Sequence, residues 1–384
     1  MGSTWWTKPE ELDQKQHTVI SLPKEGSHLI TGPAGCGKTN LLLLRAAYLH
    51  KLRITNVAVF TFGRVLREFL VAGSANYPFA GDKIQTYVRW GATLLNANGM
   101  TFDDKGDFSQ VRERLLEALK ELADKNLQQN VFDCLLLDEA QDYSGEEIAT
   151  ISRFAETIFA VGDSRQRITT MTGGLEQLKT ICDTNTELTD HYRNGRKICR
   201  LADGILNELD SEDGMEASTK YNENEFESSV RSYGDLSIDE QATACIEEIQ
   251  TQLTAYPGEL IGVLCPRQDE IDAVWSILST SPIGKDSQLQ KFLGGYSAFD
   301  ANRRVIVTTI HGAKGLEFRA LHLLGMDKIS KFPTQKRMAY TAVTRCKTSL
   351  RIYHHNHLPG YLEKGLAAVD SAPVDQPSVN DLFL

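Results

Sequence analysis

The sequence lacks the features that would assign it to a membrane or extracellular class. It contains no apolar run of about 18 residues, the length that a helix needs to cross a bilayer. Its first residues, MGSTWWTKPEELDQ, are polar and acidic after the tryptophan pair, so they do not resemble a secretory signal. The seven cysteines form no CxxC pair and are odd in number. We therefore expect a cytoplasmic protein with reduced thiols, without structural zinc or disulfides.

Basic charge is also scarce. The 384 residues include 41 Lys and Arg against 51 Asp and Glu, which gives a formal net charge of −10. Because Lys and Arg contacts to phosphate supply most non-specific affinity for nucleic acids, this balance excludes indiscriminate coating but permits a local basic groove. Much of the acidic excess lies in residues 208–227, which we interpret as a solvated loop.

The alternation of apolar runs and amphipathic segments predicts the fold class. Short apolar, β-branched runs with helix-patterned segments between them occur at 28–31, 57–62, 83–87, 134–138 and 158–163. After an interruption the pattern resumes with runs at 259–266, 304–310 and 350–355. Such alternation is typical of parallel α/β sheets with helices on both faces. Since the length also favours two domains, we expect two α/β domains, and the sequence shows no internal repeat.

A glycine-rich segment follows the first apolar run and opens a helical pattern. It reads GPAGCGKT and matches G-x-x-x-x-G-K-[ST] in its strand–loop–helix context. Its backbone N–H groups are expected to surround phosphates at the positive end of the helix. Lys38 would reach the β- and γ-phosphates, and the Thr39 hydroxyl would ligate Mg²⁺. The predicted phosphate-binding residues are Gly32, Pro33, Ala34, Gly35, Cys36, Gly37, Lys38 and Thr39.

Residues 134–142 read CLLLDEAQD, an apolar strand that ends in crowded carboxylates. Like charges this close raise one another's pKa unless a cation lies among them. A divalent metal bound with a nucleotide resolves this conflict. We expect Asp138 to hold Mg²⁺ and Glu139 to orient or deprotonate the attacking water. Phosphoryl transfer also needs positive charge near the γ-phosphate, usually from an arginine.

Together with other motifs in the same order, these segments resemble the core of UvrD/Rep-type superfamily 1 helicases. The further motifs are LDQKQ (12–16), TFGR (61–64), QTY (85–87), VGDSRQ (161–166), LTDHYR (188–193), TIHGAKGLEF (309–318) and YTAVTR (340–345). The resemblance implies two tandem RecA-like domains that bind ATP in the cleft between them. We expect the first domain at 1–180 with a short helical insertion at about 91–130, the second at 181–370, and a loose tail at 371–384.

The resemblance also implies roles for individual residues. Those implied in nucleotide recognition are Gln16 as reader of the adenine, Tyr192 stacked on it and Glu317 at the ribose. Those implied in hydrolysis are Gln166 as γ-phosphate sensor, Gln141 as its coupling to motion, and Arg193 and Arg345 as arginine fingers. Those implied in contacts with the single strand are Thr61, Arg64, Thr86, Tyr87 and His311.

Two features common in this family are missing. The chain is too short for the large helical insertions that hold or melt the duplex. Where the family usually has IYxWRG, this chain has Thr169 and Met171 at the positions of the Tyr and Trp. Base–aromatic stacking contributes about 1–3 kcal/mol per base, so we expect a weak grip on the strand. The nearby Trp90 could substitute, but we interpret it as a core residue.

These observations leave two functions open. One is an ATP-dependent single-stranded-DNA translocase or helicase, with 3′-to-5′ polarity implied by the family. The other is a DNA-sensing ATPase switch that regulates a partner such as a nuclease, as compact relatives do in bacterial antiviral defence systems. The missing aromatics and insertions favour the switch, whereas the retained strand motifs favour the motor. A small-molecule kinase would leave the motifs at 309–318 and 340–345 unexplained.

Overall fold

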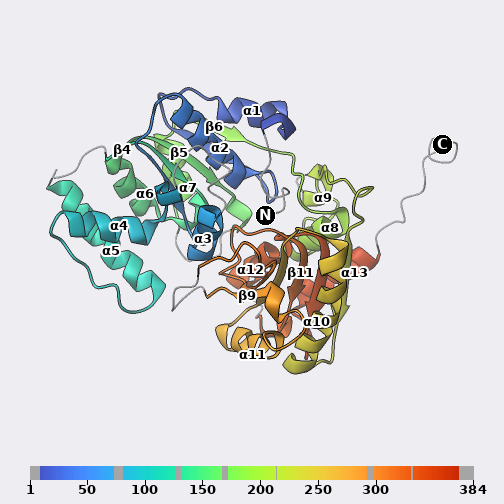
Figure 1. Ribbon diagram of the computed structural model, residues 1–384. Coiled ribbons are helices and arrows are strands. Elements are labelled where there is room, and N and C mark those ends of the chain that lie inside the picture. The colour runs from blue at the N-terminus through green and yellow to red at the C-terminus, as the bar shows by residue number, and fades with distance from the viewer. Residues whose placement is uncertain are drawn as a thin grey trace.

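The computed structural model describes residues 9–72, 81–125, 131–166, 172–212, 214–291, 298–329 and 332–371. These residues form two parallel sheets of six strands each, and the chain completes the first sheet before it begins the second. We term the parts built around them the first and second domain. They lie side by side, the first in blue to green and the second mostly in yellow to red (Figure 1).

The first sheet has the strand order β3-β2-β4-β5-β1-β6, and every pair in it is parallel. Its strands are β1 (His28–Thr31), β2 (Val57–Thr61), β3 (Ile84–Thr86), β4 (Phe132–Leu137), β5 (Ala155–Gly162) and β6 (Thr184–Glu187). The first five coincide with the predicted apolar runs. β6 is polar, was not anticipated, and extends the first sheet beyond residue 180.

Helices cover both faces of this sheet. They are α1 (Gln14–Ile20), α2 (Lys38–Lys51), α3 (Arg64–Ala72), α4 (Tyr87–Ala97), α5 (Phe108–Asp124), α6 (Gly145–Ile151) and α7 (Gly174–Ile181). Because successive side chains of a strand point to opposite faces, Ile30 packs in a cluster with α2, whereas Leu29 packs in a cluster with α4 and α5. The region expected as a helical insertion contains the end of α4 and all of α5.

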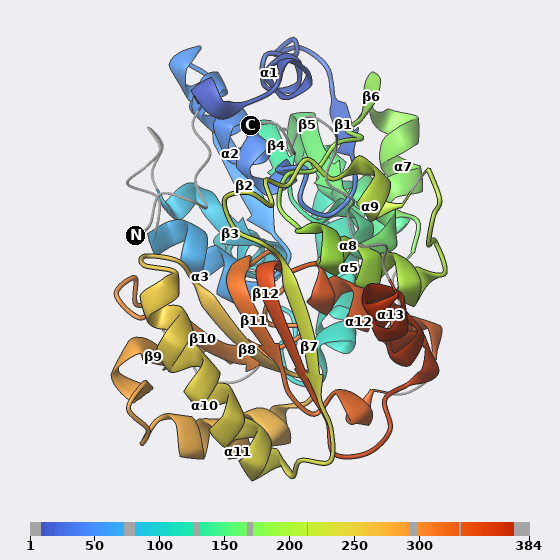
Figure 2. The ribbon, with the colours of Figure 1, turned by 90° about the vertical axis from the view of Figure 1, so that its right-hand side faces the viewer.

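The second sheet has the order β7-β12-β11-β8-β10-β9 and is also parallel throughout. Its strands are β7 (Ser229–Tyr233), β8 (Ile261–Cys265), β9 (Ser287–Leu289), β10 (Val305–Thr309), β11 (Phe318–Leu323) and β12 (Cys346–Tyr353). Its helices are α8 (Arg196–Leu206), α9 (Met215–Ser218), α10 (Ile238–Ala255), α11 (Gln268–Leu278), α12 (Pro333–Val343) and α13 (Gly360–Asp370). α10 and α11 lie on one side of this sheet, and α12 and α13 lie on the other (Figure 2).

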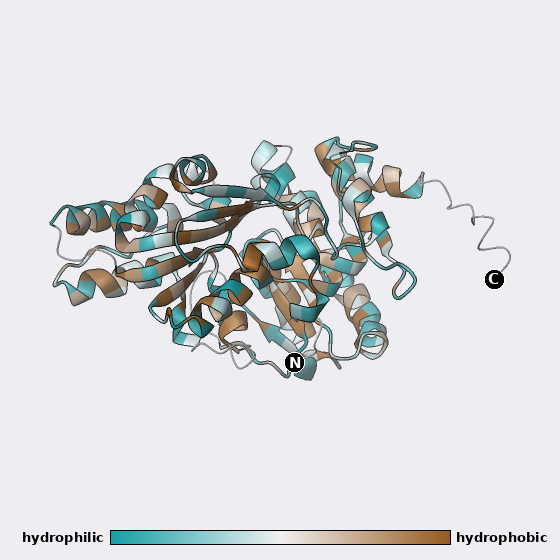
Figure 3. Cartoon of the chain, turned by 90° about the horizontal axis from the view of Figure 1, so that it is seen from above, coloured by the Kyte–Doolittle hydropathy of each residue, from teal (hydrophilic) through white to brown (hydrophobic). Residues whose placement is uncertain are grey.

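Apolar residues concentrate along the strands, between the helices (Figure 3). The two domains also contact each other through apolar side chains. The rings of Phe69 on α3 and Phe299 in the second domain are 5.2 Å apart, and Leu66 of α3 packs against Gly315. Within the described residues, no helix is long and apolar enough to cross a membrane. All seven cysteines are described, and each is a free thiol.

Candidate functional site

The glycine-rich residues 32–39 form the loop between β1 and α2. Gly35 and Gly37 have φ angles of +80° and +85°, which glycine adopts without steric cost. A Cβ atom on Gly35 would lie 2.7 Å from the Cβ atom of Arg193. Glycine is therefore needed at position 35 both for the backbone conformation and for the close approach of this arginine.

Lys38 curls back over the loop. Its ammonium group donates to the carbonyl oxygens of Gly32 at 2.8 Å and Pro33 at 2.7 Å. Ala34 and Cys36, each 1% exposed, are buried in the loop. The loop thus combines an ammonium group with the N-terminus of α2, and both favour a phosphate.

Asp138 and Thr39 meet at the end of β4. The Thr39 hydroxyl donates to Asp138 Oδ2 at 2.9 Å. Burial, together with the neighbouring Glu139 carboxylate, raises the pKa of Asp138 to about 7. Hydroxyl, carboxylate and phosphate oxygens are the ligands that Mg²⁺ prefers, so this pair suits an ion completed by phosphate and water. Among the described residues no group of three or more His, Cys, Asp or Glu could hold a metal, which agrees with an ion held partly by its substrate.

Glu139 is buried and oriented beside this pair. It is 7% exposed, and one carboxylate oxygen accepts a hydrogen bond from Gln141 Nε2 at 2.5 Å. Burial raises the pKa of Glu139, but three nearby cations outweigh this effect and hold the pKa below its usual range. The cations are Lys314, Arg345 and Lys38. An ionised and oriented carboxylate can position a water molecule or accept its proton.

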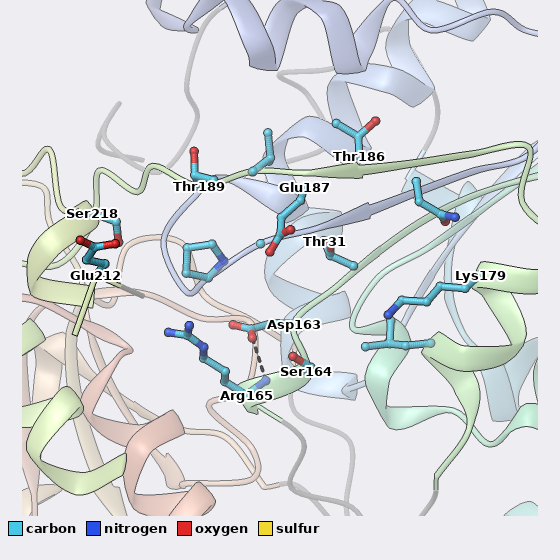
Figure 4. Close-up of a pocket in the computed structure, with 15 residues that line it drawn as sticks. Thr31, Asp163, Ser164, Arg165, Lys179, Thr186, Glu187, Thr189, Glu212 and Ser218 are labelled. Carbon is cyan, nitrogen blue, oxygen red and sulfur yellow. Dashed lines mark hydrogen bonds between the residues drawn. The ribbon is translucent and has the colours of Figure 1, made fainter. Parts of the chain in front are cut away.

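Gln141 links Glu139 to the end of β5. Its side-chain oxygen accepts from the backbone N–H of Asp163 at 2.9 Å. The carboxylate of Asp163 in turn accepts from the backbone N–H of Arg165, and both residues border a cavity of about 400 Å³ beside the start of the glycine-rich loop (Figure 4). Because one amide joins the DEAQD segment to this turn, a displacement of either segment reaches the other.

Two arginines face the same point. Arg345, directly before β12 and 3% exposed, donates to the side-chain oxygen of Gln166 in the first domain. Arg193, on the connection between β6 and α8, pairs with Glu317 of the second domain. Within the described parts of the chain, the Nε atoms of both arginines are buried and have no hydrogen-bond acceptor. A phosphate group between the domains would supply such acceptors, so these residues fit a bound nucleotide.

A larger cavity, of about 700 Å³, extends from the loop between the two domains. Gln16 lies on its wall, where its side-chain oxygen accepts from Asp13 N and its Nε2 donates to Cys36 O. The amide retains one N–H and one oxygen lone pair, which match N7 and the N6 amino group of adenine. Tyr192, 41% exposed, also lines the cavity, and its hydroxyl donates to Asp13 at 2.7 Å.

Sequence reasoning missed the outer wall of this cavity. Residues of the second domain that line it include Lys220, Tyr221, Asn222, Glu225, Phe226, Arg319 and Lys347. Several belong to the acidic segment 208–227, so that segment is not simply a solvated loop. The available signal was the pair of aromatic residues, Tyr221 and Phe226, within an otherwise polar stretch.

Lys314 was also given no role from the sequence. This side chain of the TIHGAKGLEF segment is 2% exposed and crosses to the first domain. It forms an ion pair with Asp142, and its Nζ atom lies 3.8 Å from the Glu139 carboxylate. It therefore connects the second domain directly to the carboxylates that end β4.

The residues implied in strand binding are not gathered on one exposed surface. Thr61 is fully buried, and its hydroxyl donates to Gly63 O. Tyr87 is 4% exposed, with its ring 6.2 Å from that of Trp90 and 5.8 Å from that of Tyr143. Trp90 is equally buried, as its interpretation as a core residue requires. Neither Tyr87 nor Trp90 offers an open ring face to a base.

The other three lie closer to the surface. Thr86 caps α4 by accepting from the backbone N–H of Arg89 at 3.3 Å. Arg64 donates to the carbonyl of Lys291 at 2.7 Å and so lies at the boundary between the domains. His311 is half-buried and lines a third cavity, of about 260 Å³. Thr169 and Met171 lie outside the described residues.

Comparisons with known proteins match both halves of the chain. A model of the UvrD-like helicase C-terminal domain matches residues 304–353, and a model described as an AAA domain matches residues 15–172. The structure of the Pif1 helicase from Candida albicans is similar over 90% of this chain and 94% of that chain, with 13% identity and a TM-score of 0.53. The C-terminal domain of a possible DNA helicase from Lactobacillus plantarum WCFS1 is 15% identical and covers 46% of this chain and 96% of its own, with a TM-score of 0.34. No curated protein matches the chain. The likeness to the Pif1 helicase shows a shared fold of two parallel-sheet α/β domains.

Proposed function

We propose, from the premise that this chain is a helicase-type P-loop ATPase of the UvrD-like kind, that it hydrolyses ATP between its domains to move along single-stranded DNA. The observation that carries this proposal is the contact between Arg345 of the second domain and Gln166 of the first, beside Glu139 and the glycine-rich loop. Groups from both domains then act on one phosphate, so hydrolysis depends on how the domains sit relative to each other.

Each group in the cleft has a defined task. The glycine-rich loop and Lys38 bind the phosphates, and Glu139 orients the attacking water and accepts its proton. Arg193 and Arg345 stabilise the negative charge that develops on the transferred phosphoryl group. Thr39 and Asp138 would hold Mg²⁺, which neutralises charge on the phosphate oxygens.

Movement follows from the contacts that cross the cleft. Arg345 contacts Gln166, and Lys314 contacts Asp142 and the backbone carbonyl of Gln166. All four side chains are at most 3% exposed. A change in charge at the γ-phosphate position alters the balance of these buried interactions and with it the separation of the domains. The 3′-to-5′ polarity rests on the resemblance to UvrD-like helicases.

A second function is favoured by the burial of Thr61 and Tyr87. If few side chains hold the strand, the same cleft serves better as a switch that senses a DNA strand and regulates a partner such as a nuclease. The net charge of −10 agrees with a weak hold on nucleic acid.

The test is the ATPase rate of the purified chain with and without an oligothymidylate, together with strand displacement on a tailed duplex, at about 0.15 M salt. We expect hydrolysis that the single strand accelerates, and poor unwinding of duplex by the chain alone. Lys38→Ala serves as the control that removes hydrolysis. Acceleration without any movement along the strand would favour the switch, and a rate that no single strand changes would contradict both functions.

A further inference from the structure

Binding of a single strand normally requires flat apolar surfaces as well as charge, because bases stack on aromatic rings. Among the described residues, the large apolar side chains that remain exposed are Leu52 at 43%, Tyr192 at 41% and Phe332 at 69%. Tyr192 lines the nucleotide cavity, and Leu52 ends α2 in the first domain. Phe332 is thus the aromatic side chain in this set that is exposed away from the nucleotide.

Phe332 lies at the mouth of the third cavity. It is the N-cap of α12, and its carbonyl accepts from the backbone N–H of Gln335 at 3.0 Å. Gln335 and Thr334, which follow in the first turn, line the cavity of about 260 Å³. The other residues that line it are Pro266, Arg267, His311, Lys328 and Met338. An exposed ring therefore adjoins a cavity with two cations and a histidine.

The sheet order aligns these basic residues. Strands β11, β8 and β10 are neighbours in that order, and they are followed by Lys328, Arg267 and His311 respectively. Since parallel strands end at the same edge of a sheet and lie about 4.8 Å apart, the three side chains form a row along that edge. The next strand, β9, leads to Lys291, whose carbonyl accepts from Arg64 of the first domain. The row therefore continues to the boundary between the domains.

The charge at this edge favours an anion. Arg267 and Lys328 are both exposed. Two carboxylates lie nearby, and both accept hydrogen bonds from the backbone: Asp327 from His355 and Asn356, and Glu270 from Arg267. Asp327 is 3.9 Å from the Lys328 ammonium group. The N-terminus of α12 has no side-chain cap, so its positive end adds to the attraction for phosphate.

We infer that Phe332 and the cavity beside it form a subsite for a single-stranded polynucleotide, in which Phe332 stacks on a base and Arg267 and Lys328 bind the flanking phosphates. This inference rests on the proposed function, which it extends with the strand contacts of the second domain. The subsite supplies the stacking surface that the buried Tyr87 and Trp90 do not offer. DNA and RNA strands present the same phosphates and base faces to it.

The test measures binding of a labelled oligothymidylate to the full chain by fluorescence anisotropy. We expect Phe332→Ala to weaken binding about tenfold, the scale of one lost stacking contact, and Phe332→Trp to retain it. Leu52→Ala, which removes another exposed apolar side chain, is the matched control and leaves binding unchanged. The same titration with oligouridylate identifies which polynucleotide binds more tightly, and the loss with Phe332→Ala applies to that one.

Two further measurements separate stacking and charge from a general effect on folding. The emission of the tryptophan added by Phe332→Trp is quenched when the strand binds, and that of Leu52→Trp is not. Lys328→Ala lowers the slope of log K against log salt by about 0.7, the value for one phosphate contact of a single strand. Lys125→Ala, with the same 47% side-chain exposure as Lys328, does not change the slope. Unchanged binding in Phe332→Ala overturns the inference alone, whereas a wild-type chain that binds no strand overturns the proposed strand function as well.

Discussion

At the scale of single residues, Glu139 carries the most unusual backbone of the site. Its φ of +51° lies in the left-handed region that residues other than glycine rarely adopt. Such a conformation costs on the order of 1–3 kcal/mol and persists only where the surroundings over-determine it. The hydrogen bond from Gln141 and the nearby Lys314 ammonium group are such surroundings. The carboxylate is thus held in one direction.

Glu139→Gln tests this role. We expect ATP to bind with near-normal affinity while turnover falls by at least about 100-fold, the scale of a lost general base. Steady-state hydrolysis and titration with a fluorescent ATP analogue measure the two effects separately. Glu146→Gln, at an acidic side chain that is 71% exposed on α6, is the control. Near-normal hydrolysis by Glu139→Gln would show that another group handles the water.

Residues close together in the sequence were predictable, and residues brought together by folding were not. Lys38, Thr39 and the DEAQD carboxylates belong to short motifs whose spacing alone indicates their chemistry. The contact of Arg345 with Gln166 joins positions 179 residues apart, so only the resemblance to a family suggested that they meet. Lys314, which crosses 172 residues to Asp142, was missed because no local pattern marks it.

At the scale of secondary structure, the strands that the sequence did not reveal all lie at sheet edges. β6 ends the first sheet, and β7 and β9 are the two outer strands of the second. An edge strand pairs on one side, so it tolerates polar residues and short length. β6 reads TNTE and β9 reads SQL, neither of which shows the apolar run that marked the central strands. Apolar patterning therefore predicted the interiors of both sheets and missed three of their borders.

Strand β11 makes a prediction about pH. His322 on this strand is fully buried between the Tyr353 hydroxyl and the Gln252 amide, and burial lowers its pKa to about 3. An unfolded histidine has a pKa of about 6.5, so between these values the unfolded chain binds the additional proton. The free energy of unfolding should therefore fall as the pH drops below about 6.5, by up to about 1.4 kcal/mol per pH unit for this residue.

Urea unfolding at pH 7 and pH 5 measures this effect. His322→Gln should show a smaller loss in the urea midpoint between the two pH values than the wild type. His191, whose pKa burial lowers to about 4, contributes with the same sign and remains in the variant. His357→Gln, at a fully exposed side chain, should behave like the wild type. An identical pH dependence in His322→Gln and the wild type would contradict the assignment.

At the scale of the whole molecule, the arrangement of the two domains completes the active site. The sequence predicted two parallel α/β domains because each contains its own series of apolar runs. It did not predict their relative orientation, since that depends on contacts such as Phe69 with Phe299 and Arg64 with Lys291. These pairs carry no signal in either segment alone.

Arg345→Ala tests whether the second domain takes part in hydrolysis. Because arginine fingers contribute about 10³–10⁵ to turnover in related chemistry, we expect a loss of at least about 100-fold. ATP affinity should change little, since the glycine-rich loop remains intact. Arg231→Ala, at an exposed arginine on β7, controls for the loss of one positive charge. A parallel fall in affinity and turnover would indicate a role in ground-state binding instead of transition-state stabilisation.

The strand order of the first sheet has a consequence for the birth of the protein on the ribosome. β1, the first strand to be made, pairs with β5 and β6, the last two of its sheet. Translation at about 5–20 residues per second separates these strands by on the order of ten seconds. During that interval β1 and the glycine-rich loop attached to it wait for their partners, with apolar side chains such as Leu29 and Ile30 still uncovered. The segment that binds the phosphates is thus among the first to be synthesised and the last in its domain to be fixed, and it is the part of the nascent chain most in need of a chaperone.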